Sequence, residues 1–403
     1  MLKLALRNIL RQKARSAMTL AAILFGVIGL ILSGGFIQDL FLQLGEATIH
    51  SQLGHAQIFR KGYFEAGSRS PEKYWIPDPS HIKGLVAKLP EVEDVMARLA
   101  FSGLLNNGRT DWPIIGEGVE PSAENRLGTF VQIKSGRLLD ERDKDAVLIG
   151  QGVAQSLDLN PGDSVTLLVN TPEGALNTAD LVVVGVFHSF SSEYDARAIR
   201  IPLATAQALF GTRGANAIVV SLKRTADTNL VAGLLSGRFV PQGLDVRTWT
   251  QLSDFYEKTV ELYQRQFGVL QFIVLFMVLL SVVNTVNMST FERIGEFGTM
   301  RAVGNTGRDI MRLILLENAL LGLVGSLVGV LLGYGLARLI SHYGIPMPPP
   351  PNANVGYIAH IQVIPGVMLT AFLVGLLATV GAALLPARRV ARIPVVDALR
   401  QNV

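Results

Sequence analysis

Four long runs of apolar residues divide the sequence, and each run predicts a helix that crosses a membrane. A helix needs roughly 20 apolar residues to span about 30 Å of hydrocarbon, because each residue advances it by about 1.5 Å. Each run contains a stretch of about that length without Asp, Glu, Lys or Arg. We expect the four membrane helices at 17–38, 265–290, 311–340 and 366–386.

The first run could belong to a cleaved secretion signal or to a permanent membrane anchor. It is longer than the apolar core of a secretion signal, and no small-x-small cleavage pattern follows Ser33-Gly34-Gly35. We therefore expect this helix to remain in the mature protein as an anchor.

The stretch 39–264 between the first two runs has the short periodicities of a folded α+β domain. Residues 80–89 have helical spacing, whereas 92–104 and 110–118 alternate apolar and polar residues around a turn at Asn106-Asn107-Gly108. Further strands are expected at 164–169, 181–187, 217–222 and 244–247. Because the chain leaves its first block of strands and later returns to it, we expect two interleaved subdomains, the second at about 126–212.

The residues just before the second run also have helical spacing. Apolar side chains recur at intervals of three and four from Leu252 to Leu270, and no Gly or Pro interrupts them before Gly268. We expect one continuous helix that leads from the external domain into the membrane and transmits displacement along its length. The alternative is a packed connector without a mechanical role.

Lys and Arg residues are concentrated at alternate connections between the runs. They crowd 1–16, recur in 291–310 and follow the last run in 387–403, while the loop 341–365 contains none. Short cytoplasmic segments retain Lys and Arg, so both termini and the connector 291–310 are expected in the cytoplasm. The domain 39–264 and the loop 341–365 are then periplasmic. This pattern predicts a multi-pass protein of the cell inner (plasma) membrane.

Residues 1–16 are also amphipathic when placed on a helix. Leu2, Leu6 and Leu10 share one face, while basic residues recur every fourth position on another. This predicts a helix that lies in the cytoplasmic interface of the membrane. A purely topological signal is the simpler alternative, and the two are compatible.

The composition agrees with a membrane protein and excludes several classes of site. Hydrophobic residues make up 49% of the chain and charged residues 17%. The net charge of +4 lies beside the expected inner leaflet, which indicates contact with membrane lipids rather than with nucleic acid. The absence of cysteine excludes a disulfide framework and Cys-ligated metals. The six histidines lack metal-ligand spacing, so neither a metal site nor a catalytic site is predicted.

The third run carries glycine at every fourth residue, at Gly325, Gly329 and Gly333. Glycine costs about 1 kcal/mol relative to alanine in a helix interior. Close contact between helix backbones is the usual way to offset that cost in a membrane. We therefore expect a tight helix interface, either within one subunit or across a dimer. General glycine enrichment of membrane helices is the alternative.

The connector 291–310 combines charges at helical spacing with an aromatic residue. Glu292, Arg293 and Glu296 can form ion pairs, and Phe297 can act as an apolar anchor. A short charged helix between two membrane helices is suited to docking into a cleft on a soluble partner. An ordinary solvated loop is the alternative.

The ends and the connector of the chain resemble one known family. The run Glu296-Phe297-Gly298-x-x-Arg301-Ala302-Val303-Gly304 is similar to the coupling segment of the FtsX-like permeases of ABC transporters, which include the MacB type. The opening Leu6-Arg7-Asn8-Ile9-x-Arg11 and the closing run from Leu385 to Arg400 resemble the same family. The resemblance covers the whole chain and implies a mechanotransmission type of permease.

Within this family, the external domain is most similar to the lipoprotein-releasing LolC/LolE group. The similarity rests on Gly185-Val186-Phe187-x-Ser189 and on Pro202-Leu203-x-x-Ala206-Gln207. The connection 170–179 is a departure, since it is shorter than the hairpin with which LolC-type proteins capture a lipoprotein chaperone.

The resemblance implies a permease subunit whose motor is a separate chain. The sequence contains no Gly-Lys pair, which a phosphate-binding loop requires, so this chain is expected to be neither an enzyme nor the holder of a cofactor. ATP and Mg are expected in cytoplasmic ABC ATPase subunits. Further expected partners are a second permease subunit, identical or paralogous, and a periplasmic carrier or adaptor. The implied coupling residues are Glu292, Arg293, Glu296, Phe297, Gly298, Arg301 and Gly304.

The implied function is to couple ATP hydrolysis to extraction or export of a lipoprotein, lipid or other amphiphile at the outer face of the inner membrane. The residues expected to line a substrate cavity between the first two membrane helices are Phe36, Leu40, Phe41, Tyr263, Phe267 and Leu270. Two alternatives stay open. One is an FtsX-like signalling subunit that activates an external hydrolase, and the other is MacB-like efflux of small molecules or peptides with an adaptor.

Overall fold

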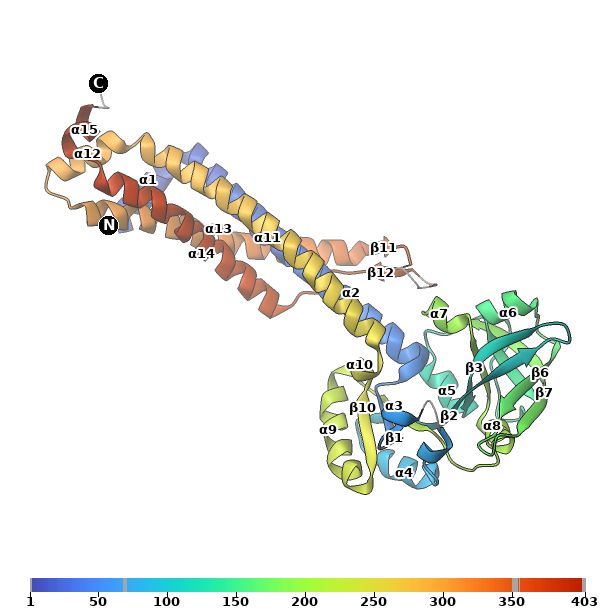
Figure 1. Cartoon of the computed structure of the whole chain (residues 1–403). Helices are drawn as coiled ribbons and strands as arrows, with labels where there is room; N and C mark the ends of the chain where they lie inside the picture. Colours follow the sequence, from blue (N-terminus) through green and yellow to red (C-terminus); the bar gives the residue numbers. More distant parts are fainter. Residues whose placement is uncertain (1, 68–70, 350–353, 355, 401–403) are drawn as a thin grey trace. The chain divides into compact units, whose positions relative to one another are not determined.

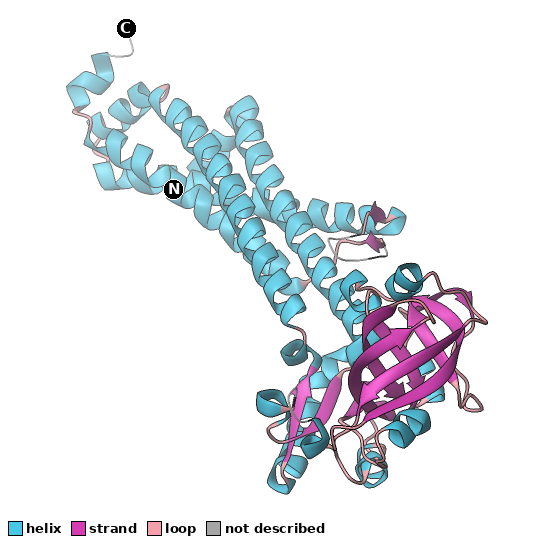
Figure 2. Cartoon of the chain, turned by 45° about the vertical axis from the view of Figure 1, so that its right-hand side comes forward, coloured by secondary structure: helices cyan, strands magenta, loops and turns pink. Residues whose placement is uncertain are grey.

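The computed structural model describes residues 2–67, 71–349, 354 and 356–400. The chain divides into two compact units. Unit 1 comprises Met1–Phe41, Val260–Pro346 and Ile358–Val403, and unit 2 comprises Leu42–Thr259 and Met347–Tyr357. Unit 1 is almost entirely helical, whereas unit 2 is built on β-strands (Figure 2).

Unit 1 is a bundle of long helices joined at one end by a short one (Figure 1). Its helices are α1 Leu2–Arg11, α2 Lys13–Thr48, α11 Asp254–Phe291, α12 Ile294–Ala302, α13 Gly307–Tyr343, α14 Pro365–Arg392 and α15 Val395–Arg400. Four of them, α2, α11, α13 and α14, are long and apolar enough to cross a membrane. Helices α2 and α11 both continue unbroken into the residues of unit 2.

The two ends of the bundle differ in charge. Helices α2 and α13 begin, and α11 and α14 end, at what we call the basic end, which holds the N-terminal basic residues and Arg388, Arg389 and Arg392. At the opposite end, a loop with two short strands, β11 Ile345–Met347 and β12 Tyr357–Ala359, connects α13 to α14. The buried Asp39 carboxylate fixes this loop to α2, since it accepts hydrogen bonds from His360 N (2.8 Å) and Gln362 Nε2 (2.7 Å).

Unit 2 contains ten strands and eight α-helices among its described residues. The strands are β1 Ala56–Arg60, β2 Val92–Asn106, β3 Asp111–Val119, β4 Gln132–Gly136, β5 Ala146–Gly150, β6 Ser164–Asn170, β7 Leu176–His188, β8 Ala198–Pro202, β9 Ala217–Leu222 and β10 Leu244–Thr248. The helices are α3 Tyr63–Ala66, α4 Pro79–Val86, α5 Pro121–Leu127, α6 Gln151–Leu157, α7 Ser192–Asp195, α8 Leu203–Leu209, α9 Thr228–Phe239 and α10 Trp249–Leu252. The expected strands and the hairpin at Asn106-Asn107-Gly108 are therefore confirmed, with Gly108 at φ 85°, and the helix expected at 80–89 occupies Pro79–Val86.

The first subdomain is an antiparallel sheet with helices packed on it. Its strand order is β10-β1-β9-β2, and all three pairings are antiparallel. Apolar residues of α4 and α9, including Val86, Val231 and Phe239, pack into one core with strand residues such as Ile58 and Val220. This sheet joins strands from both ends of the 42–259 stretch, as expected from the return of the chain.

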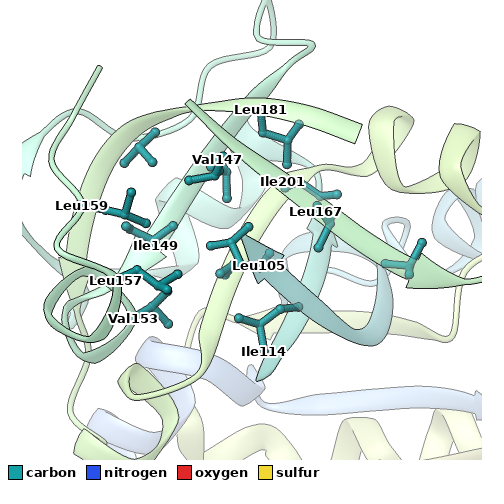
Figure 3. Close-up of a cluster of buried hydrophobic side chains, with 14 of the residues drawn as sticks. Leu105, Ile114, Val147, Ile149, Val153, Leu157, Leu159, Leu167, Leu181 and Ile201 are labelled. Carbon is teal, nitrogen blue, oxygen red and sulfur yellow. The ribbon is translucent and has the colours of Figure 1, made fainter. Parts of the chain in front are cut away.

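The second subdomain is a closed six-stranded barrel. Its order is β2-β3-β8-β5-β7-β6, and β6 pairs again with the end of β2 through Leu104↔Leu168 to Asn106↔Thr166. Apolar side chains from all around the barrel, among them Leu105, Ile114, Val147 and Leu167, fill its interior (Figure 3). Closure pairs the strands laterally and so protects their backbone groups.

Strand β2 belongs to both subdomains, because its first half pairs with β9 and its second half with β3 and β6. Two of the six barrel strands, β2 and β3, precede residue 126. The second subdomain therefore begins earlier than the expected 126–212. The expected class, four membrane helices with a large α+β domain of two subdomains, is confirmed.

A π-helix at Ile49–Leu53 ends α2, and buried arginines of unit 2 bind its carbonyl oxygens. Arg98 of β2 donates to the Gln52 carbonyl, and Arg200 of β8 donates to the Ser51 carbonyl at 3.0 Å. Glu124 of α5 pairs with Arg98, at 2.6 Å between Oε1 and Nη2. Because Arg98 belongs to β2 and Arg200 belongs to β8, these two hydrogen bonds fix the end of α2 to both strands.

His55 lies just after the π-helix and is held as a neutral imidazole. Its Nδ1 accepts a hydrogen bond from Leu222 N (3.1 Å), so the proton must be on Nε2, which donates to Thr225 Oγ1 (3.1 Å). Thr225 in turn donates to Glu46 (2.6 Å). The side chain is 1% exposed, and burial, with repulsion from His50, lowers the pKa of His55 to about 4.

We predict that His55 makes the chain less stable as the pH falls. The unfolded chain takes up a proton at His55 near pH 6.5, whereas the folded chain does so only near pH 4, so stability is lost between these values. The loss should reach about 3 kcal/mol. His55→Gln should flatten the fall in thermal stability of the full chain between pH 7 and pH 4.5. His81→Gln changes an exposed histidine and should leave this fall in thermal stability unchanged. If thermal stability fell equally with pH in wild type and in His55→Gln, the assignment of the fall to His55 would be contradicted.

Candidate functional site

The connector between α11 and α13 is a helix rather than a solvated loop. After α11 ends at Phe291, α12 occupies Ile294–Ala302, and Thr306 caps α13 by a reciprocal pair of hydrogen bonds with Asp309. Gly304 has a φ of 108°, which side chains other than glycine rarely adopt, and it makes the turn between the two helices. The family-like sequence from Glu296 to Gly304 therefore folds as one helix and one turn.

A buried charge network fixes this connector to its neighbours. Arg293 donates to both carboxylate oxygens of Glu317 on α13, at 2.7 and 3.2 Å, and Asn8 of α1 donates to the same carboxylate at 2.6 Å. Arg293 and Glu317 are only 6% and 7% exposed. The guanidinium also lies 5.0 Å from the centre of the Phe297 ring. The network thus joins α1, the start of α12 and α13.

Two exposed ion pairs extend this network to the N-terminal residues. Arg15 pairs with Glu292, and Arg11 pairs with Glu296. Exposed pairs contribute little stability, so these two add little to the buried network that fixes the connector. Besides their expected role in topology, the N-terminal arginines are therefore partners of the connector.

The expected coupling residues fall into a buried group and an exposed group. Phe297 is 2% exposed and packs with Ile310, Leu313 and Val390, and Gly298 is buried beside it. Phe297 therefore is not available as a direct anchor for a partner, because the apolar faces of α13 and α14 already cover it. Arg301 donates to the Ile393 carbonyl at the end of α14. Glu292, Glu296 and Gly304 remain exposed.

Sequence reasoning did not single out the most exposed apolar residue of the connector. Val303 is 81% exposed and lies between Arg301 and the turn at Gly304. The sequence shows that Val303 belongs to the family-like motif. Only the packing shows that Val303 is exposed whereas Phe297 is buried.

The glycine stripe of α13 packs against α2 of the same chain. A Cβ at Gly325, Gly329 or Gly333 would lie 3.0, 2.9 and 3.0 Å from the nearest side-chain atom of Ile23, Val27 and Ile31, respectively. The branched residues of α2 have the same four-residue spacing as the glycines. The expected tight interface therefore lies within one subunit in this structure.

A cavity of about 370 Å³ lies in unit 1 between α2, α11 and α14. Its lining residues are Leu30, Gly34, Ile37, Gln38, Phe41, Gln264, Phe267, Gly268, Gln271, Val367, Thr370, Ala371 and Val374. Two of the expected cavity residues, Phe41 and Phe267, are among them.

The other expected cavity residues do not line the cavity. Phe36 and Tyr263 pack on Phe267, with ring centres 6.5 and 6.1 Å from that ring. Leu40 is buried and Leu270 is exposed on another face of α11. Sequence reasoning missed Gln38, Gln264 and Gln271, although Gln264 and Gln271 are seven residues apart and so share one helix face.

Comparison with known families agrees with this architecture. Residues 16–237, more than half of the chain, match the MacB-like periplasmic core domain, and residues 268–395 match the C-terminal part of FtsX-like permeases. The chain belongs to the FtsX-like and MacB-like permease family. It is an ABC transporter permease of the FtsX, MacB and LolC/LolE type.

Individual relatives within this family are distant. The lipoprotein-releasing system transmembrane protein LolE of Haemophilus influenzae is 24% identical, over 77% of this chain and 73% of its own length. LolC of Neisseria meningitidis is 23% identical, over 81% of this chain and 78% of its own length. The macrolide export ATP-binding/permease protein MacB of Neisseria gonorrhoeae is 24% identical over 85% of this chain, which spans only 53% of that protein.

Among solved structures, the periplasmic region of MacB from Actinobacillus actinomycetemcomitans is similar to part of this chain. It covers 51% of this chain and 93% of its own, with 16% identity and a TM-score of 0.37.

We predict that leucine at Gly329 disrupts the α2–α13 contact. Its side chain would overlap Val27, and overpacking of this kind costs about 1–3 kcal/mol. Gly329→Leu should therefore lower the thermal midpoint of the detergent-solubilised chain. Gly335→Leu is the matched control, since a Cβ at Gly335 meets no described atom within 4 Å. Equal midpoints for the two variants would contradict the interface.

We also predict a large cost for removing one partner of the buried charge network. Arg293→Met leaves the Glu317 carboxylate without its main counter-charge and should lower the free energy of unfolding by about 3–5 kcal/mol. Arg265→Met removes the exposed pair with Glu261 and should change it by less than about 1 kcal/mol. Unfolding in mixed micelles measures both values. If Arg293→Met changed the free energy of unfolding as little as Arg265→Met does, the buried network would not be needed for stability.

Proposed function

We propose that this permease couples ATP hydrolysis by separate ABC ATPase subunits to extraction or export of a lipoprotein, lipid or other amphiphile at the outer face of the inner membrane. The connector at the basic end carries this proposal, because it presents an exposed surface while its other face is bonded to the bundle. ATP and Mg belong to the ATPase subunits, and a second permease subunit completes the transporter.

The charge distribution supports the orientation. The basic end contains the N-terminal basic residues, the arginines of the connector and those that end α14. Short segments rich in Lys and Arg are retained in the cytoplasm, so both termini and α12 face the cytoplasm in this proposal. Unit 2 is then periplasmic.

The packing of α12 suits the transfer of force from a docked partner. Its inner face is fixed to α1 and α13 through Arg293 and to the end of α14 through Arg301. The exposed side of the connector carries Glu296 on α12 and, just after this helix, Val303 and Gly304. Displacement of α12 by a partner therefore moves the ends of several membrane helices together, and α11 and α2 carry it towards unit 2 as continuous helices.

The cavity between α2, α11 and α14 favours transport over a signalling role. It is lined mostly by apolar side chains and includes Phe41 and Phe267, which suits the acyl chain of an amphiphile. A subunit that only transmits a signal does not require such a space. A periplasmic carrier or adaptor would receive the cargo.

The test is a charge on the exposed face of the connector. Val303→Asp puts a carboxylate at the proposed contact without touching the buried network, and should weaken ATPase binding by about tenfold or more. The full chain is purified from its own host with its bound subunits, the ABC-type ATPase is identified by mass spectrometry, and ATP hydrolysis is measured. We expect the amount of bound ATPase and the rate of ATP hydrolysis both to fall in Val303→Asp.

Leu176→Asp is the matched control, since it places the same charge at a 65% exposed apolar residue of unit 2. It should retain the ATPase. Wild type without any bound ABC-type ATPase, or Val303→Asp with undiminished ATPase and hydrolysis, would refute the proposed coupling.

A further inference from the structure

A second, smaller cavity of about 40 Å³ lies inside the basic end of unit 1, between α1, α2, α11 and α13. Most of its lining residues are polar or charged. Four of these, Thr19, Thr290, Glu317 and Asn318, are no more than 7% exposed. Polar side chains at such a place in a membrane bundle need hydrogen-bond partners, so the partners of each group show what an occupant must supply.

The hydroxyl groups of the wall can only accept hydrogen bonds from an occupant. A hydroxyl has one proton, and each serine and threonine of the wall already donates its proton elsewhere. The acceptors are the Ile9 carbonyl for Ser16, the Arg15 carbonyl for Thr19, the Ser281 carbonyl for Thr285, Gln12 Oε1 for Ser289 and the Val286 carbonyl for Thr290. Such bonds are common in helices, but here the remaining lone pairs surround one cavity.

The carboxamide of Asn318 adds a buried acceptor to this wall. Its Nδ2 donates to the Ile314 carbonyl at 2.8 Å, and since a carbonyl can only accept, this bond fixes the orientation of the amide. Oδ1 has no hydrogen-bond partner in the part of the chain that the structure describes. The side chain is 6% exposed, so Oδ1 has lost most of its contact with water. An occupant that donates to Oδ1 would offset this cost.

The charges in and beside the wall balance. They form three arginine–glutamate pairs, which are Arg11–Glu296, Arg15–Glu292 and Arg293–Glu317. An occupant with a net charge would lack a counter-ion here, which is expensive away from water. The cavity therefore favours an occupant that is neutral overall.

Two half-buried residues of the wall supply free donors. Gln12 Nε2 has no hydrogen-bond partner among the described residues, and the guanidinium of Arg15 uses one nitrogen, for Glu292. The cavity thus combines acceptors on its buried residues with donors on less buried ones. A zwitterion with an ammonium group and a phosphate matches both sets and carries no net charge.

The volume limits the ammonium group that can enter. A water-sized group needs about 10–15 Å³ of such a cavity, so about 40 Å³ admits roughly three of them. The nitrogen and two methylene carbons of an ethanolamine group fit this space. A trimethylammonium group is larger, and it has no N–H with which to donate.

The surroundings of the cavity favour a lipid as the source of this group. Helix α1 contributes Asn8 to the wall, and its Leu6 and Leu10 are 52% and 63% exposed. Exposed leucines beside a headgroup site suit contact with acyl chains. A soluble ligand would gain nothing from them.

We propose that this cavity binds the headgroup of a phosphatidylethanolamine-type lipid. The ammonium group donates to Asn318 Oδ1 and to the hydroxyl oxygens of Thr19 and Thr290. The phosphate stays on the less buried side and accepts from Gln12 and Arg15. The bound lipid bridges α1, α2, α11 and α13, and this role depends neither on the proposed ATPase coupling nor on the cargo.

Three dioleoyl lipids that differ only in their headgroups test the proposal. Phosphatidylethanolamine has the primary ammonium group, phosphatidylcholine has no N–H, and phosphatidylglycerol has a net negative charge. Binding of each lipid to the full chain in detergent is measured by native mass spectrometry across a concentration series. We expect phosphatidylethanolamine to bind about tenfold more tightly than the other two, the gain from one or two net hydrogen bonds.

Variants assign that preference to the wall of the cavity. Thr290→Val removes one acceptor with little change of shape, and Asn318→Leu removes the buried amide. Each should reduce the affinity for phosphatidylethanolamine towards that for phosphatidylcholine, and Thr290→Val decides the test if Asn318→Leu does not fold. Thr379→Val is the matched control. Thr379 is also buried and donates to the carbonyl four residues before it, but it does not line this cavity.

Equal binding of phosphatidylethanolamine and phosphatidylcholine would indicate that the cavity holds only water, and would overturn the proposal. Tighter binding of phosphatidylglycerol, or an equal loss of affinity in Thr379→Val and Thr290→Val, would also overturn it. Free O-phosphoethanolamine at millimolar concentration should leave the lipid bound, because it lacks acyl chains. Displacement of the lipid by this compound would refute the assignment of the site to a lipid.

Discussion

The interaction on which unit 1 depends most is the buried pair between Arg293 and Glu317. Removing two opposite charges from water is expensive, and their attraction repays that cost only when further hydrogen bonds satisfy them. Here Asn8 binds the carboxylate, while Glu296 and the Phe297 ring lie against the guanidinium. A set of contacts that is favourable only when complete holds α1, α12 and α13 in one arrangement. The exposed face of the connector therefore has a defined position.

Unit 2 uses the same kind of interaction for a different purpose. Arg98 and Arg200 neutralise Glu124 and Glu117 and bind the carbonyls of the π-helix that ends α2. A π-helix leaves carbonyl groups in irregular positions, and such segments are often found at functional sites. In both units, buried arginines fix the place where a long helix meets a short one. In the proposed function, a helix end held in this way passes a displacement on to the elements that hold it.

Local patterns predicted much of the fold. The membrane helices follow from uninterrupted apolar length, and the hairpin at Asn106-Asn107-Gly108 follows from residues that accept positive φ. Barrel closure could not be predicted, because the pairing of Leu104 with Leu168 joins strands far apart in the sequence. The shared role of β2 is equally non-local, which explains why the expected start of the second subdomain at 126 is too late.

The candidate site shows the same division. The connector could be recognised from its charges and motif, but periodicity does not tell whether Phe297 faces a partner or its own bundle, since an apolar residue suits both. Phe41 and Phe267 of the cavity could be predicted from the sequence, because large aromatic residues are easily recognised in apolar runs. The glutamines were missed: Gln264 and Gln271 share one face of α11, but only the packing of α2 against α11 brings Gln38 to the same cavity.

The contact between α2 and α13 also constrains how this bundle can move. Ile23, Val27 and Ile31 each sit over a glycine, and the residues between the glycines carry side chains. A small slide of α2 would drive a branched side chain against those neighbours, whereas a slide by four residues, about 6 Å, restores the match at two of the three positions. Relative motion of these helices along their axes is therefore stepwise, with one helical turn as the smallest favourable displacement.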